Sequence, residues 1–180
     1  ICMGDYYKSF RVVGTNASYF DKLTVGDDRN FSFASGRNFR DDEFFGAVVG
    51  ISVAQKLGLS VGDTIAPTHG ADDGLVHDPF TITGILARTD TPVDRGVYVN
   101  MEGFYLQEGH SKPTADGAST EVTDGEHHDD SHDDHGHHKP LPYAQREVTA
   151  ILVQTASPGG MPPELLAMGL KNTINEGRDG

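Results

Sequence analysis

Residues 107–142 show no periodic pattern of apolar side chains, so any hydrophobic core has to be built without them. They are mainly Gly, Pro, Asp, His, Ser and Thr. Connections inside compact domains are usually only a few residues long, and long structureless ones are rare. We therefore expect 107–142 to be a flexible His/Asp-rich insertion, disordered for much of its length, within one core domain formed by residues 1–106 and 143–180.

The charge is as unevenly distributed as the apolar residues. The chain has 14 Lys and Arg against 27 Asp and Glu, a net charge of -13, yet residues 121–138 contain no Lys or Arg. Binding to phosphates requires clustered basic side chains, so the composition excludes a nucleic-acid partner and docking on an anionic membrane surface. The single cysteine, Cys2, excludes an intrachain disulfide and a Cys-based zinc site.

Hydrophobic patterns on both sides of the insertion predict an α+β fold with a mixed β-sheet and flanking helices. Strands are expected at 10–15, 47–51, 64–66, 80–87, 97–99 and 147–155, and helices at 53–57, 102–106 and from 162 onward. Gly58 is placed to end the first of these helices in a left-handed conformation. Residues before Phe10 show no recognisable element, so we expect Cys2 to lie in a frayed terminus and the chain to be a fragment of a longer protein.

Three stretches carry a family resemblance. They are Val13-Gly14-Thr15 with Tyr19-Phe20 and Gly36-Arg37-Asn38-Phe39; Ala47-Val48-Val49-Gly50 with Val53-Ala54, Leu57-Gly58 and Val61-Gly62-Asp63-Thr64-Ile65; and the run that begins at Phe80, with Thr89-Asp90-Thr91-Pro92-Val93-Asp94 and Val97-Tyr98-Val99. In order and spacing they resemble the extracytoplasmic core domain of MacB/FtsX-type ABC transporter permeases. The chain departs from that pattern before residue 10 and in the insertion at 107–142.

The resemblance implies a location and a set of partners. Such domains belong to inner (plasma) membrane permeases and protrude into the periplasm or the outside space. A cytoplasmic ABC ATPase drives them through the full-length permease, and a periplasmic adaptor protein can join the assembly. The isolated domain is then expected to be a monomer and the full transporter a dimer. ATP hydrolysis is expected to be coupled to substrate export or to mechanical work.

The insertion itself contains the densest set of metal-ligating side chains, in residues 126–138, which we call the His/Asp tract. Its candidate ligands are His127, His128, Asp129, Asp130, His132, Asp133, Asp134, His135, His137 and His138. Imidazole and carboxylate groups are ligands for Zn²⁺, Ni²⁺ and Cu²⁺. We expect labile binding of divalent metal through several alternative ligand sets; a solvated acidic spacer is the alternative.

A second group of possible ligands lies in the 67–79 loop and consists of His69, Asp72, Asp73, His77 and Asp78. We interpret it as a polar turn, with a metal site as the less favoured alternative. His110 is interpreted as an ordinary loop residue.

No catalytic motif is recognisable in the chain, and its only dense group of ligands lies in the segment expected to be most flexible. We therefore expect no catalytic residues, no enzyme activity and no required cofactor. Two functions remain open. One is the permease domain with a metal-binding loop; the other is a free-standing periplasmic metal-binding or metallochaperone protein. Transmembrane helices encoded on either side of this segment would distinguish the two.

Overall fold

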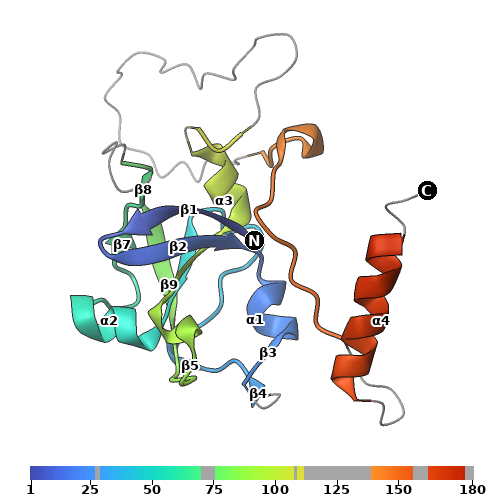
Figure 1. The fold of residues 1–180 in the computed structure, drawn as a ribbon. Helices are drawn as coiled ribbons and strands as arrows, with labels where there is room; N and C mark the ends of the chain where they lie inside the picture. The colour runs from blue at the N-terminus through green and yellow to red at the C-terminus, as the bar shows by residue number, and fades with distance from the viewer. Residues whose placement is uncertain (27–28, 70–75, 108, 112–138, 156–161, 177–180) are drawn as a thin grey trace. The chain divides into compact units, whose positions relative to one another are not determined.

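The computed structural model describes residues 1–26, 29–69, 76–107, 109–111, 139–155 and 162–176 (Figure 1). In chain order their elements are β1 (Cys2–Tyr7), β2 (Phe10–Thr15), α1 (Ser18–Lys22), β3 (Thr24–Val25), β4 (Arg29–Asn30), β5 (Phe33–Gly36), β6 (Gly46–Val49), α2 (Ile51–Leu57), β7 (Thr64–Ile65), β8 (Thr68–His69), β9 (Phe80–Leu86), the 3₁₀ helix η1 (Pro92–Arg95), β10 (Val97–Asn100), α3 (Met101–Leu106), the 3₁₀ helix η2 (Tyr143–Gln145) and α4 (Pro163–Glu176).

The described strands form one mixed sheet and a short hairpin. Their order in the sheet is β5-β9-β6-β10-β2-β1-β8, with β7 pairing on β9, and β3 pairs with β4. The β6–β9 and β10–β2 pairs are parallel, and the other pairs are antiparallel. The predicted α+β class and mixed sheet are therefore confirmed. Most of the expected insertion at 107–142, namely residue 108 and residues 112–138, lies outside the described part of the chain.

Strand β6 is buried on both faces, as its continuous apolar sequence predicts. Ala47 and Val49 join a core with Val53 and Phe104, so this face packs against α2 and α3. Val48 points the opposite way, into a second core that contains Phe20 of α1 together with Phe39, Leu86 and Tyr98. The sheet thus lies between two apolar layers.

Helix α2 ends as the sequence predicts. Gly58 has φ 68°, and its N–H donates to the carbonyl of Ala54. The helix begins earlier than the predicted residue 53, at Ile51, and Gly50 is the N-cap. Gly50 has no room for a side chain, because a Cβ there would lie 2.3 Å from the carbonyl oxygen of Asp94.

Two carboxylates, Glu43 and Asp94, accept hydrogen bonds that fix loops in or beside the stretches that carry the family resemblance. Arg37 donates two hydrogen bonds to the Glu43 carboxylate, at 2.6 and 2.7 Å, and these lower the pKa of Glu43 to about 2. Asp94 is buried and accepts from the backbone and hydroxyl of Thr89, at 2.8 and 2.7 Å, and from the N–H of Asp90. Burial raises the pKa of Asp94, but the hydrogen bonds from Thr89 and Asp90 outweigh it, and the pKa is lowered.

Two predictions about the ends of the chain are wrong. The first residues form a strand, β1, and Cys2 is 4% exposed, with its sulfur 3.2 Å from the carbonyl oxygen of Glu147. Conversely, 147–155 form no strand. The N–H groups of Thr149 and Ala150 both bond to the carbonyl of Ile1, so no ladder of alternating bonds is built.

The described chain separates into two compact units, 1–150 and 151–180. The second unit contains α4, which begins at a proline and has an acidic residue, Glu164, in its first turn, as the sequence predicts. Within the described residues, none of the helices combines the length and apolar character needed to span a bilayer.

Candidate metal centre

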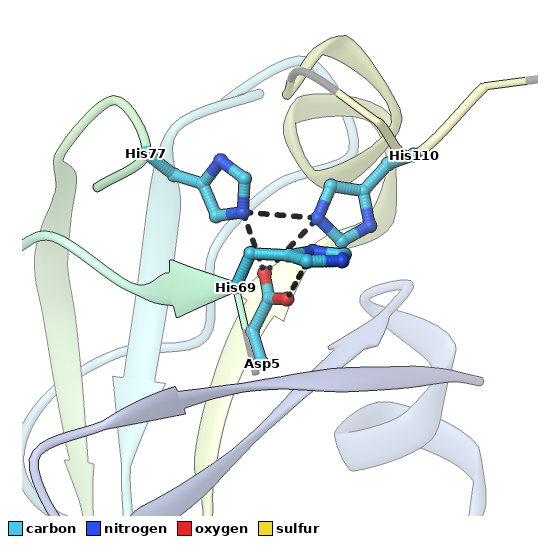
Figure 2. A group of neighbouring side chains, drawn as sticks. All are labelled: Asp5, His69, His77 and His110. Atoms are coloured by element: carbon cyan, nitrogen blue, oxygen red, sulfur yellow. Dashed lines mark hydrogen bonds and ion pairs between the residues drawn. The ribbon is translucent and has the colours of Figure 1, made fainter. Parts of the chain in front are cut away.

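Four side chains from distant parts of the first unit converge on one point: Asp5, His69, His77 and His110 (Figure 2). One ligand atom from each lies within 4.8 Å of the corresponding atoms of the other three. The chain has nine histidines, six of them in the His/Asp tract. The three histidines outside the tract therefore all lie in this cluster, which we call the four-ligand cluster.

Asp5 is turned inward by an irregularity in β1. Met3 pairs with Val13 and Tyr6 with Arg11, so two residues of β1, Gly4 and Asp5, face a single residue of β2. Such a bulge changes the direction in which the following side chains point. As a result Asp5 is 0% exposed although it lies on a strand near the edge of the sheet.

His69 and His77 are brought to Asp5 by strand pairing. His69 lies directly across from Asp5 in the β1–β8 pair, and its Nδ1 is 3.4 Å from Oδ1 of the carboxylate. Thr68 bridges to Val76, and the N–H of His77 donates to the carbonyl of Pro67. His77 is thereby folded back beside β8, with its Nε2 3.4 Å from Oδ2 of Asp5.

His110 comes from the turn after α3, and its Nε2 is 3.2 Å from Oδ2 of Asp5 and 3.1 Å from Nε2 of His77. Its ring packs against Phe104 of α3, with the ring centroids 4.2 Å apart. The buried side chain of Gln107 accepts a hydrogen bond from the N–H of Asp78, next to His77, while its backbone carbonyl accepts from His110. Gln107 thus links the segments that carry these two histidines.

The Asp5 carboxylate is the unusual member of the cluster. Neither of its oxygens accepts a hydrogen bond from the described residues, although both are fully buried. The three imidazole nitrogens are close to it but lie outside hydrogen-bonding geometry. A buried carboxylate without hydrogen bonds is costly unless a positive charge compensates it. A divalent cation between the four groups would supply that charge.

The site predictions from sequence have mixed outcomes. His127, His128, Asp129, Asp130, His132, Asp133, Asp134, His135, His137 and His138 lie outside the described residues, and so do Asp72 and Asp73. His69 and His77 do come together, but their partners are Asp5 and His110, which sequence reasoning did not connect with them. The interpretation of His110 as an ordinary loop residue missed its place in the cluster.

A second feature, an open pocket, shares His110 with the cluster. This pocket of about 580 Å³ is lined by Cys2, Tyr105, His110, Arg146 and Glu147, among others. Arg146 donates to Glu102 of α3 at 2.7 Å and to the carbonyl of Leu141 at 2.6 Å. The segment that contains Leu141 and Arg146 is therefore also held against α3.

A family model described as the MacB-like periplasmic core domain matches residues 4–158. The chain belongs to this family. The MacB-like domain is an extracytoplasmic domain of ABC transporter permeases, and its context is a membrane transporter with a cytoplasmic ATPase. The matched range begins inside β1 and includes all residues of the four-ligand cluster. A comparison with curated proteins found no match.

Proposed function

We propose that this MacB-like domain couples ATP hydrolysis by the cytoplasmic ATPase to export of a substrate or to mechanical work across the membrane, and that it does so without catalysing a reaction itself. The family match over residues 4–158 carries the proposal. It supports a permease domain over a free-standing periplasmic metal-binding or metallochaperone protein. The proposal includes a dimeric transporter and a periplasmic adaptor as a further partner.

The construction of the first unit supports a domain that moves as one rigid piece. The central strand β6 is buried on both faces, and the sheet is packed between two apolar layers. Close-packed interiors of this kind deform little and transmit displacement. A force applied at one edge of the sheet would therefore reach the opposite edge instead of being absorbed inside the domain.

The proposal can be tested by distance measurements on the full-length permease reconstituted with its ATPase. Spin labels at Asp42→Cys and Lys56→Cys occupy exposed positions, and Cys2, the one cysteine of the 180-residue chain, is buried. With a single label on each permease copy, we expect ATP binding to change the distance between the two domains. With both labels on one copy, the distance within the domain should not change. An inter-domain distance that is the same with and without ATP would refute coupling through this domain.

A further inference from the structure

We propose that Asp5, His69, His77 and His110 form a tetrahedral Zn²⁺ site that fastens the turn after α3 to the β1–β8 edge of the sheet. This inference concerns the domain itself and is independent of its role in transport. It differs from the metal binding expected of the His/Asp tract, because none of the four ligands lies in the tract.

The distances fit a tetrahedral ion. Zn²⁺ binds imidazole nitrogen and carboxylate oxygen at about 2.0–2.2 Å, so two ligands of a tetrahedral site lie roughly 3.3–3.5 Å apart. Oδ2 of Asp5, Nε2 of His77 and Nε2 of His110 form a triangle with sides of 3.1, 3.2 and 3.4 Å. Three corners of a square plane would instead include one pair about 4 Å apart, which argues against the square-planar geometry of Cu²⁺ or Ni²⁺.

His69 supplies the fourth ligand. Its Nδ1 is buried, has no hydrogen-bond partner among the described residues and lies 3.4 Å from Asp5. The rest of its side chain is 41% exposed, so the ring has the freedom to adjust when the ion binds. The set of three imidazoles and one carboxylate excludes Mg²⁺ and Ca²⁺ as the preferred ions, because these favour six or more oxygen ligands.

The alternative is a metal-free cluster of histidines around a carboxylate. That arrangement requires imidazole N–H groups to donate to Asp5, yet neither oxygen accepts a hydrogen bond from the described residues. His110 and His77 do form a hydrogen bond with each other through their Nε2 atoms, at 3.1 Å, but it leaves both Asp5 oxygens without a donor (Figure 2). A cation between the four groups would compensate the buried carboxylate and bind the imidazole nitrogens at the same time.

The ion would join three segments of the chain that are far apart in sequence. His110 lies two residues before the undescribed residues 112–138, and His69 and His77 stand on either side of residues 70–75. Four protein ligands fill a tetrahedral shell, which is typical of structural zinc sites rather than catalytic ones with an open position. Binding would therefore hold His69, His77 and His110, the described residues next to these two segments, on the edge of the sheet.

The test must separate this site from the His/Asp tract. We would use the 180-residue chain with each of the six tract histidines changed to Asn, so that only the four-ligand cluster retains imidazole ligands. Metal-free protein should bind one equivalent of Co²⁺ with the intense visible absorption of tetrahedral cobalt, and Zn²⁺ should displace it. Loss of binding in this background, or the weak absorption of octahedral cobalt, would overturn the proposal.

Variants in the same background assign the ligands. Asp5→Asn keeps the size of the side chain and should weaken Zn²⁺ binding at least 100-fold, and so should His77→Ala. Asp78→Asn is the matched control, since it removes an exposed carboxylate beside His77. It should change affinity less than about 3-fold. Equal losses for Asp5→Asn and Asp78→Asn would show that charge alone attracts the metal and would overturn the assignment.

Two further measurements distinguish loss of the metal site from loss of the fold. His69→Ala alters the most exposed of the three histidines and should leave the circular dichroism spectrum unchanged while it weakens Zn²⁺ binding. In the parent background, Zn²⁺ should slow hydrogen exchange at the His110 amide, which donates to Gln107. If exchange there is the same with and without Zn²⁺, the ion does not fasten this turn.

Discussion

The Asp5→Asn variant should change the stability of the domain in opposite directions with and without zinc. In the presence of a chelator, wild-type Asp5 keeps a carboxylate that is 0% exposed and accepts no hydrogen bond from the described residues. The amide of asparagine is neutral and has the same shape, and it can both donate to and accept from the surrounding imidazoles. We expect the variant to be more stable than wild type by about 1–2 kcal/mol under these conditions.

Zinc should reverse the order. An ion present at 100 times its dissociation constant stabilises the folded state by about 2.7 kcal/mol. Wild type gains this amount, whereas the variant gains little because it has lost its only anionic ligand in the cluster. The wild-type protein should then be the more stable of the two by about 1 kcal/mol, which corresponds to roughly 2–4 °C in Tm for a chain of this size.

Urea unfolding followed by circular dichroism and tyrosine fluorescence measures both comparisons, since the chain has six tyrosines and no tryptophan. The background with the tract histidines changed to Asn keeps the tract from contributing. Asp78→Asn serves again as control and should follow wild type in both conditions. A variant less stable than wild type in chelator by about 1 kcal/mol or more would refute the reasoning. It would show that the imidazoles already compensate the Asp5 charge without metal.

Three further predictions concern the framework around the site. Asp94→Asn should lower the free energy of unfolding by about 1.5–3 kcal/mol in urea titrations, because the new amide nitrogen would face a backbone N–H donor. The control is Asp90→Asn, at an exposed position with φ 58°, whose free energy of unfolding should stay within about 0.5 kcal/mol of wild type. The lowered pKa of Glu43 adds stability that is present above its ordinary value of 4.5 and is lost as the pH falls toward 2. In Arg37→Ala, the stability that the protein loses between pH 4.5 and pH 2 should be smaller than in wild type by about 1 kcal/mol, a modest difference because the arginine is half exposed. An unchanged dependence of stability on pH would contradict the pairing of Arg37 with Glu43. Gly58→Ala should destabilise the domain by about 1–2 kcal/mol in thermal melts, since φ 68° is unfavourable for a residue with a Cβ, and a neutral result would contradict the assigned cap.

The central elements were predictable because several local signals agree there. Strand β6 has a continuous apolar sequence, and α2 follows it at once and ends at Gly58. Strand β1 was missed because its bulge breaks the alternation of buried and exposed residues on which strand prediction relies. At 147–155 the strand prediction followed β-branched composition, which says nothing about whether a partner strand is available.

The site was less predictable than the fold, and the reason is distance along the chain. Composition alone drew attention to the His/Asp tract, where ligands are dense in sequence. The four-ligand cluster instead depends on the pairing of β1 with β8 and on the turn after α3, which no local sequence window contains. One signal was present: the three histidines outside the tract lie in or next to the connections between elements, since His69 ends β8, His77 precedes β9 and His110 follows α3.

The short helix α3 has a consequence for how this domain could be engineered. The ring of His110, in the turn after this helix, packs against Phe104 of the helix, and Arg146 pairs with Glu102 of the same helix. Residues on both sides of 112–138 are thus fastened to the same helix. Loop-closure entropy also rises only slowly with length. A foreign module, such as a fluorescent reporter or an affinity epitope, is therefore best inserted between His110 and Arg146, where we expect it to leave the core of the MacB-like domain intact.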